Sequence, residues 1–349
     1  DSAITGVTWT IDRDTRSNYQ LATSGNVTFM GAGNIAMNVL LSGAYTVTKN
    51  GTGTTTLGAT NTYTGITTIN GGILSISSDA NLGNAPGSAT AGSLVFNGGA
   101  LQATATFTLN SNRGISLGAS GGSVSVDSAK TLTYGGIVAD VSGATGALTK
   151  TGAGTLILSG TNSYTGITTI SAGTLSINTD RSLGGVPGSV TAGSLVLNGG
   201  TLLATADITL SSNRGISLGA SGGVFSVDSA KTLTYGGIVA NVSGATGTLT
   251  KSGAGTLTLS GANTYTGGTT VSGGKLVAGV PSTGAITNGP FGTGTVTVQS
   301  GYTVDLNGFN VANAFNLSGA GLSSNGALIN STSTALTLPG TITLAADTT

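Results

Sequence analysis

Residues 150–160 read KTGAGTLILSG, and the same stretch returns as KSGAGTLTLSG at residues 251–261 and, more loosely, as KNGTGTTTLGA at residues 49–59. Successive copies start 101 residues apart. A fixed offset of this kind is the mark of a repeat architecture and takes precedence over any local pattern. The chain is therefore expected to consist of similar structural units.

Two further motifs obey the same offset. NRGISLGASGG occupies residues 112–122 and recurs unchanged at residues 213–223. A tyrosine motif occurs three times, as NTYTGITTI from Asn61, NSYTGITTI from Asn162 and NTYTGGTTV from Asn263. The sequence thus predicts three long repeats, near residues 49–149, 150–250 and 251–349.

Hydrophobic side chains alternate with polar ones inside the repeated stretch. Leu156 and Leu158 alternate with Thr and Ile neighbours, and Leu257 and Leu259 repeat the pair. A period of two is typical of a strand with one buried face, so these leucines are predicted to point inward. The first copy has Thr55 where the others have leucine, which predicts a weaker coil there.

Strand and turn signals recur at a spacing finer than 101 residues. Short alternating runs closed by Gly or Asn follow one another roughly every 20 residues, as repeat solenoids require. We therefore predict an all-β fold, a right-handed parallel β-helix with about 20 residues per coil, about five coils per long repeat and roughly 17 in all. The alternative is one compact sandwich domain per repeat.

The Asn and Tyr of the tyrosine motif are interpreted as structural. Asn is cheap in left-handed turns, and its amide could satisfy turn backbone groups or join an Asn ladder. The tyrosines lie too many coils apart to stack, so each is expected to pack against its own neighbours. The residues concerned are Asn61, Asn162, Asn263, Tyr63, Tyr164 and Tyr265.

The two parts of the chain differ in how well they match the repeat. Residues 1–24 match poorly and concentrate charge, which predicts an N-terminal cap over an open strand edge. Residues 25–349 are predicted to form one continuous parallel β-helix. An uncovered edge at the far end would allow end-to-end pairing with another copy of the chain.

Composition excludes several classes of function. Charged residues make up 6% of the chain against roughly 25% in ordinary domains, and the net charge is +0, so no basic stripe exists for nucleic acid. No apolar run approaches the roughly 20 residues that span a bilayer, so this segment is not expected to insert into a membrane.

The residues of acid–base catalysis are also scarce. His, Cys and Glu are absent and the eleven Asp are scattered, so no catalytic pair, metal site or cofactor site is predicted and the chain is interpreted as non-enzymatic. Asp12 and Asp14 lack the rest of a calcium loop. A polysaccharide-active β-helix enzyme remains a minor alternative.

A few charges recur once per repeat. Arg113 and Arg214 occupy equivalent positions and are predicted to be exposed charges that could contact a ligand. Asp127 with Lys130, and the equivalent pair one repeat later, are predicted to form exposed ion pairs worth under about 1 kcal/mol.

The stretch KSGAGTLTLSGANTYTGGTTVSGGKLV from Lys251 to Val277 resembles the autotransporter-associated β-strand repeat of bacterial passenger domains. The copies at Lys49 and Lys150 are similar, and the segment from residue 318 onward resembles what often follows such repeats. The resemblance implies export to the outer surface of a Gram-negative bacterium, as a structural or adhesive fibre. Its partners would be a host or neighbouring cell surface, or other copies of itself, end to end or lateral. The alternative is an extracellular filament subunit joined through edge strands.

Overall fold

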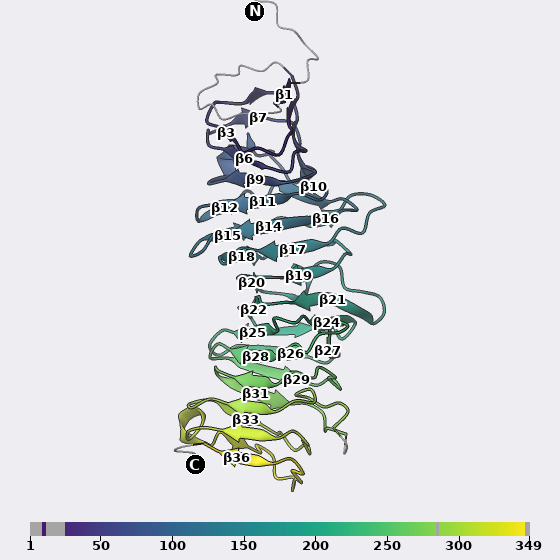
Figure 1. Ribbon diagram of the computed structural model, residues 1–349, viewed down its shortest axis with the longest axis vertical. Coiled ribbons are helices and arrows are strands. Elements are labelled where there is room, and N and C mark those ends of the chain that lie inside the picture. The colour runs from purple at the N-terminus through teal and green to yellow at the C-terminus, as the bar shows by residue number, and fades with distance from the viewer. Residues whose placement is uncertain (1–8, 12–24, 284–285, 346–349) are drawn as a thin grey trace, which may run out of the picture. The chain divides into compact units, whose positions relative to one another are not determined.

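The computed structural model describes residues 9–11, 25–283 and 286–345 (Figure 1). The chain divides into two compact units. Unit 1 comprises residues 1–168 and 181–185, and unit 2 comprises residues 169–180 and 186–349. Strand β19 (Thr168–Ile170) and the short 3-10 helix η2 (Asp180–Leu183) contribute residues to both units.

The described part of unit 1 is built from parallel sheets, which we call 1a, 1b and 1c. Sheet 1a contains β1 (Trp9–Ile11), β2 (Val27–Phe29), β5 (Val47–Lys49), β8 (Thr67–Ile69), β10 (Thr90–Phe96), β13 (Arg113–Leu117) and β16 (Val138–Asp140). Sheet 1b contains β3 (Ile35–Met37), β6 (Thr54–Leu57), β9 (Ile73–Ile76), β11 (Ala100–Ala103), β14 (Gly122–Val126) and β17 (Leu148–Thr151). Sheet 1c contains β12 (Phe107–Leu109), β15 (Thr131–Tyr134) and β18 (Thr155–Leu158). Outside them lie β4 (Ser42–Gly43), β7 (Thr62–Tyr63) and the 3-10 helix η1 (Asp79–Leu82).

Unit 2 repeats this plan in sheets 2a, 2b and 2c. Sheet 2a contains β21 (Thr191–Leu197), β24 (Arg214–Leu218) and β27 (Val239–Asn241). Sheet 2b contains β20 (Thr174–Ile177), β22 (Thr201–Ala204), β25 (Gly223–Val227), β28 (Leu249–Ser252), β30 (Thr269–Val271), β32 (Val296–Val298), β34 (Phe315–Leu317) and β36 (Ile342–Leu344). Sheet 2c contains β23 (Ile208–Leu210), β26 (Thr232–Tyr235), β29 (Thr256–Leu259), β31 (Lys275–Ala278), β33 (Thr303–Asp305) and β35 (Leu328–Ile329). A short 3-10 helix, η3 (Leu322–Ser324), precedes β35.

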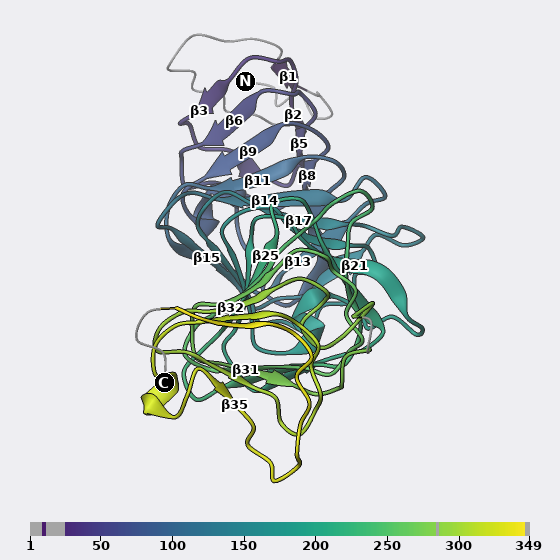
Figure 2. The same ribbon diagram turned by 60° about the horizontal axis from the view of Figure 1, so that its bottom comes forward.

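The chain visits the sheets of a unit in rotation, so each unit is a parallel β-solenoid. From β10 in sheet 1a it passes to β11 in 1b and β12 in 1c, and it returns to 1a with β13. Figure 2 shows β3, β6, β9 and β11 of sheet 1b one behind another. Because parallel strands cannot be joined by tight hairpins, winding around a common core is how short connections produce such sheets. The predicted all-β parallel solenoid is confirmed.

Alternation along each strand fills the interior. In β18 the burial pattern places Leu156 and Leu158 inside and Thr155 and Ile157 at the surface. Leu156 continues an inward column from Leu132 on the preceding coil. Since parallel strands in register stack like side chains over one another, each coil extends the same apolar core.

One long repeat of 101 residues spans four turns and one further face. In unit 1 the register of sheet 1a advances from Val47 to Thr67, Leu94, Ile115 and Val138, in steps of 20, 27, 21 and 23 residues. The counterpart of Val47 one repeat later is Leu148, which lies in sheet 1b instead.

Unit 2 shows the same offset. The register of sheet 2b runs from Thr174 to Thr201, Val224, Thr250 and Thr270. The counterpart of Thr174 is Lys275, which lies in sheet 2c. Equivalent residues of successive repeats therefore occupy different faces of the solenoid.

These registers correct the predicted coil size. A turn contains about 23 residues instead of 20, and the chain makes about 14 turns instead of 17. The sequence estimate failed because alternation identifies a strand without saying which face it occupies. It also missed the loops that lengthen individual turns, such as the 27-residue step that contains η1.

The predicted cap at residues 1–24 falls largely outside the described residues. Of this segment only β1 is described, and the backbone of β1 pairs in parallel with β2. The charged residues Asp12, Arg13, Asp14 and Arg16 lie outside the described part.

Thr55 occupies an inward position in sheet 1b, between Ile35 and Leu74 on adjacent coils. Its side chain is fully buried, and its Oγ1 has no hydrogen-bond partner among the described residues. An unsatisfied buried hydroxyl costs roughly 1–3 kcal/mol. We therefore expect Thr55→Val to raise the free energy of unfolding by about 1 kcal/mol in urea titrations.

Amide hydrogen exchange checks the same coil locally. Protection of β6 should be lower than that of β18, its counterpart with two inward leucines, and Thr55→Val should narrow the difference. Equal protection in the two strands before substitution would contradict a weaker first coil.

Candidate functional site

The tyrosine motif forms an intercoil clamp around a buried asparagine. Asn61 Oδ1 accepts a hydrogen bond from the Leu41 backbone N–H at 2.8 Å, and its Nδ2 donates to the Asn81 carbonyl at 2.6 Å. Leu41 and Asn81 lie 20 residues to either side, on the preceding and following coils. One amide thus satisfies a donor above it and an acceptor below it.

The clamp is repeated in both later copies. Asn162 Oδ1 accepts from the Val138 N–H at 2.8 Å, and its Nδ2 donates to the Ser182 carbonyl at 2.7 Å. Asn263 bonds the Val239 N–H and the Pro290 carbonyl, each at 2.7 Å. Both side chains are fully buried. These contacts join neighbouring coils without stacking one clamp asparagine on another.

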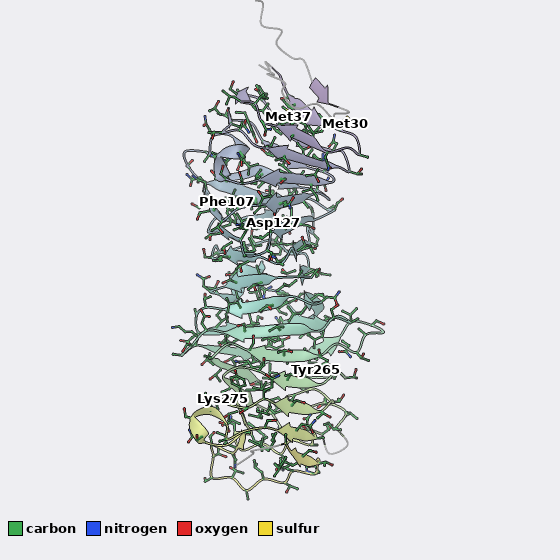
Figure 3. The ribbon with its side chains drawn as sticks, turned by 60° about the vertical axis from the view of Figure 1, so that its left-hand side comes forward. Met30, Met37, Phe107, Asp127, Tyr265 and Lys275 are labelled. Carbon is green, nitrogen blue, oxygen red and sulfur yellow. The ribbon has the colours of Figure 1, made fainter. Side chains whose placement is uncertain are left out.

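Each tyrosine of the motif is buried and bonded to a threonine four residues later. Tyr63 Oη lies 2.7 Å from Thr67 Oγ1, and Tyr265 Oη lies 2.6 Å from Thr269 Oγ1 (Figure 3 labels Tyr265). Tyr164 makes the same contact with Thr168 at 2.7 Å. Burial raises the pKa of Tyr63 to about 12 and also raises the pKa of Tyr265. Such phenols remain neutral at physiological pH.

Sequence reasoning missed a second recurring polar group, the lysine that opens each repeat. Lys49, Lys150 and Lys251 are almost fully buried. Lys150 follows Val124 in an inward column of sheet 1b, where its aliphatic stem fills a core position. Its Nζ donates to the carbonyls of Thr151 and Gly152 at 2.6 and 2.8 Å. The sequence did contain a signal for this, because the lysine stands at a position where the alternation of hydrophobic and polar residues predicts an inward side chain.

Lys251 makes the same kind of contact in unit 2. Its Nζ donates to the carbonyls of Ser252, Gly253 and Gly273 at 2.7, 2.8 and 3.0 Å. Burial lowers the pKa of Lys150 and of Lys251 to about 8, and lowers that of Lys49 as well. The lysines therefore cap corner carbonyls, and burial makes their ammonium groups easier to deprotonate.

These shifts predict a pH dependence of stability. The charged lysine is disfavoured in the folded chain, and this penalty is fully present below pH 8. It is relieved as pH rises from about 8 to 10.5, because the folded lysines lose their protons before the unfolded ones do. Above about pH 10 the unfolded tyrosines ionise first, which lowers stability again.

We therefore expect the urea midpoint to be higher near pH 9.5 than near pH 7, with both titrations completed quickly to limit Asn deamidation. The double variant K150M/K251M should flatten this rise. A midpoint that falls between these two pH values in the unmodified chain would contradict the assignment.

The predicted exposure of Arg113 is wrong, because its side chain is buried. Arg113 Nε lies 2.8 Å from Asp79 Oδ1, and Nη2 lies 3.1 Å from Asp79 Oδ2. Its guanidinium also donates to the carbonyls of Leu82, at 2.9 Å, and Gly83. It therefore fixes η1, the insertion that lengthens this turn. Alternation did not reveal this role because the partner lies 34 residues away.

Arg214 is likewise buried, so the prediction fails for it too. Its Nε lies 2.8 Å from Asp180 Oδ1, and Nη2 donates to the Asp180 carbonyl at 3.2 Å. A buried, fully engaged guanidinium is unavailable to an external ligand. Both arginines are structural.

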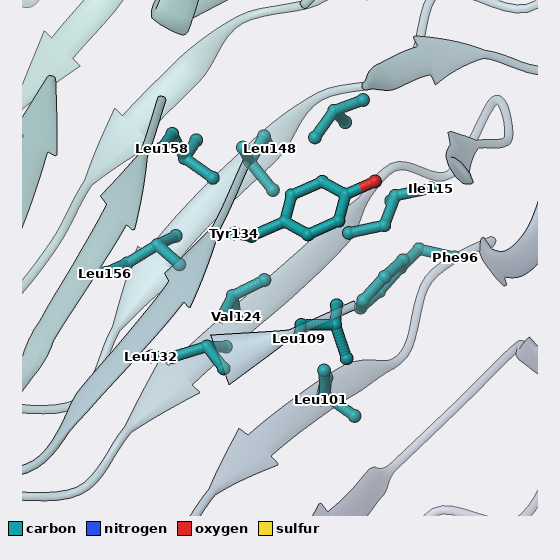
Figure 4. Close-up of a pocket in the computed structure, with 11 residues that line it drawn as sticks. Phe96, Leu101, Leu109, Ile115, Val124, Leu132, Tyr134, Leu148, Leu156 and Leu158 are labelled. Atoms are coloured by element: carbon teal, nitrogen blue, oxygen red, sulfur yellow. The ribbon is translucent and has the colours of Figure 1, made fainter. Parts of the chain in front are cut away.

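The predicted inward leucines all lie in the core. Leu156, Leu158, Leu257 and Leu259 are 0–2% exposed. Leu156 and Leu158 also line a small enclosed void of about 10 Å³, together with Tyr134 and Phe96 (Figure 4). A void of this size is at or below what one water molecule needs, and its lining is apolar, so it holds no ligand.

No group of three or more metal-ligating side chains occurs among the described residues. The ion pairs found there are Arg113–Asp79, Arg214–Asp180 and Lys275–Asp305. The predicted pair of Asp127 and Lys130 does not form. Asp127 instead accepts a hydrogen bond from Gln102 at 2.8 Å. Within the same residues, no helix is long and apolar enough to cross a membrane.

Comparison with known proteins identifies the repeat. The passenger-associated-transport-repeat family matches at residues 47–76, 148–177 and 249–278, which are the three clamp-bearing stretches described above. The chain is thus a parallel β-solenoid with three passenger-associated transport repeats, and the predicted resemblance to autotransporter passengers is confirmed.

A relative among the curated proteins is the adhesin BmaC autotransporter of Brucella suis biovar 1 (strain 1330). The identity is 38% over 244 residues, which is 66% of this chain and 7% of the adhesin. The chain therefore spans a small part of the length of that relative. No solved structure matches this chain.

Proposed function

We propose that this chain is a segment of a bacterial surface adhesin of the autotransporter passenger type. It lies outside the cell, either on the outer-membrane surface or secreted, and contacts a host or neighbouring cell without catalysing a reaction. The observation that carries the proposal is the set of three transport repeats within a parallel solenoid. The similarity to a protein named as an adhesin supports the adhesive part.

The internal construction supports a structural and adhesive role. In each repeat the recurring ionisable side chains, the lysine and, in the first two repeats, the arginine, are buried and bonded to backbone or carboxylate groups. These ionisable side chains thus stabilise the fold, while threonine, serine and asparagine dominate the outward positions. We also propose that residues 25–349 form one continuous solenoid and that residues 1–24 cap it.

Surface display tests the proposal. The chain, fused to a heterologous translocator barrel and an epitope tag, should appear on the surface of Escherichia coli and increase attachment to cultured epithelial cells. A chain that lacks residues 25–146, displayed at equal abundance, is the control for attachment caused by any protein displayed on the surface. Attachment no greater than with an unrelated β-solenoid at the same surface density would reject adhesion.

A further inference from the structure

The outer face of sheet 1a carries a shallow groove with a volume of about 450 Å³. Its floor contains Thr68 of β8 and Val95 of β10, adjacent outward positions in register. One wall is the turn at residues 141–144, which follows β16. The rest of the lining is Asn70, Asn97, Gly118 and Ala119.

The wall of the groove is fixed before any ligand arrives. The Ala144 N–H donates to the Val141 carbonyl at 2.8 Å. The Val141 N–H donates to the Leu117 carbonyl on the preceding coil, also at 2.8 Å. Asp140 Oδ1 accepts from the Gly146 N–H at 2.9 Å, which closes the loop behind the turn. A preformed wall lowers the entropy cost of binding.

The groove offers amides and methyl groups but no charge. Asn97 is exposed, and its Oδ1 accepts from the Ser120 N–H at 3.2 Å. Its amide nitrogen has no hydrogen-bond partner in the described part of the chain, and so remains a donor toward the groove's ligand. Val141 is 38% exposed and provides an apolar contact together with Val95. No charged side chain lines the groove.

The backbone beneath the groove is already engaged. β8 pairs with β5 and β10, and β10 pairs with β8 and β13. An extended peptide therefore gains no main-chain hydrogen bonds here, which excludes strand addition as the binding mode. The occupant must be held by side-chain amides, hydroxyls and methyl groups alone.

These properties fit the acetamido group of a sugar, whose carbonyl accepts from an amide N–H while its methyl packs against valine. We propose that the groove binds an uncharged glycan containing N-acetylhexosamine, which deepens the proposed adhesive function and rests on it. An anionic glycan lacks a cationic partner in this lining.

Unit 2 repeats most of the residues that line the groove. Val196, Asn198 and Val242 stand where unit 1 has Val95, Asn97 and Val141, while Ser171 stands where unit 1 has Asn70. The Ala245 N–H donates to Val242 at 2.9 Å, and Asn198 Oδ1 accepts from the Ser221 N–H at 3.1 Å, as in unit 1. Two sites per chain follow.

Isothermal titration calorimetry of the full chain with N,N′,N″-triacetylchitotriose tests the proposal. Binding with a stoichiometry of two is expected, with affinity at least about tenfold weaker for cellotriose and for the de-N-acetylated glucosamine trimer, which lack the acetamide. Absence of binding at about 10 mM triacetylchitotriose, or equal binding of cellotriose, would overturn it.

Substitutions locate the sites. V141D and V242D should each reduce the stoichiometry from two to one, and the double variant should abolish binding. I137D/I238D is the matched control, because Ile137 is also exposed and directly precedes β16, whereas Val141 directly follows it, and Ile137 does not line the groove. Unchanged binding by V141D/V242D overturns the proposal. Analytical ultracentrifugation gives a second way to overturn it. If the unsubstituted chain self-associates and V141D/V242D is monomeric but still binds the sugar, the groove binds a second copy of the chain instead.

Because these titrations use purified chain, they are independent of cell attachment. Attachment that survives V141D/V242D together with lost sugar binding would leave the adhesin proposal standing and remove the groove as its receptor site.

Discussion

Asn162→Ala is expected to lower the free energy of unfolding by about 2–5 kcal/mol, since it removes a hydrogen bond from a buried donor on one coil and from a buried acceptor on another coil. The Val138 N–H and the Ser182 carbonyl each lose the hydrogen bond to this amide, and water cannot replace the amide in a fully buried site. Urea denaturation followed by circular dichroism measures the loss.

Ser163→Ala is the control for this substitution. Ser163 is the exposed neighbour of Asn162, and its replacement should change stability by no more than about 0.5 kcal/mol. Equal effects of the two substitutions would mean that the amide does not join the coils.

Arg113→Ala should be similarly damaging, with an expected loss of about 2–4 kcal/mol. The substitution removes the partner of Asp79 and leaves the carbonyls of Leu82 and Gly83 without a donor. Arg113→Lys should recover only part of the loss, because an ammonium cannot reproduce the forked contacts of a guanidinium.

Two comparisons make this result specific. Lys130→Ala removes an exposed cation of the same repeat and should be nearly neutral. The double variant R113A/D79A should cost less than the sum of the single changes, since the two residues are coupled. A neutral Arg113→Ala would restore the view that this arginine is a surface charge.

The fold was largely predictable because its determinants are local. Leu156 and Leu158 alternate with surface residues, and the 101-residue offset makes that pattern visible three times. Because the sequence has no runs of helix-favouring residues, strands were the only regular element that it predicted. These features together define a parallel solenoid before any coordinate is known.

The turn size was not predictable in the same way. Whether a strand lies on sheet 1a, 1b or 1c depends on loop lengths between strands, and the step from Thr67 to Leu94 contains η1 within it. The offset of one face per repeat appears only when Val47 and Leu148 are placed in different sheets. β5 and β17 have similar sequences, with a buried Val or Leu and a buried Lys, although they lie in different sheets.

The polar core was partly hidden for a related reason. The buried asparagine could be recognised as structural from its recurrence before Tyr63, but its partners lie a full coil away in each direction. Arg113 and Lys150 were misjudged or overlooked because charged residues are normally exposed, and their burial depends on carbonyls supplied by corners and by η1.

The central claim is that one repeat advances four turns and one face of a parallel solenoid, and engineered cysteine pairs test it most directly in a chain without native cysteine. Ser123 and Thr149 are register partners at outward positions on β14 and β17, within the Cα separation that a disulfide bridges. S123C/T149C should therefore cross-link under mild oxidation, and T68C/V95C should do so in sheet 1a. T68C/S88C, spaced by the 20 residues of a shorter coil, should remain reduced. Cross-linking of T68C/S88C with none in S123C/T149C would contradict the account.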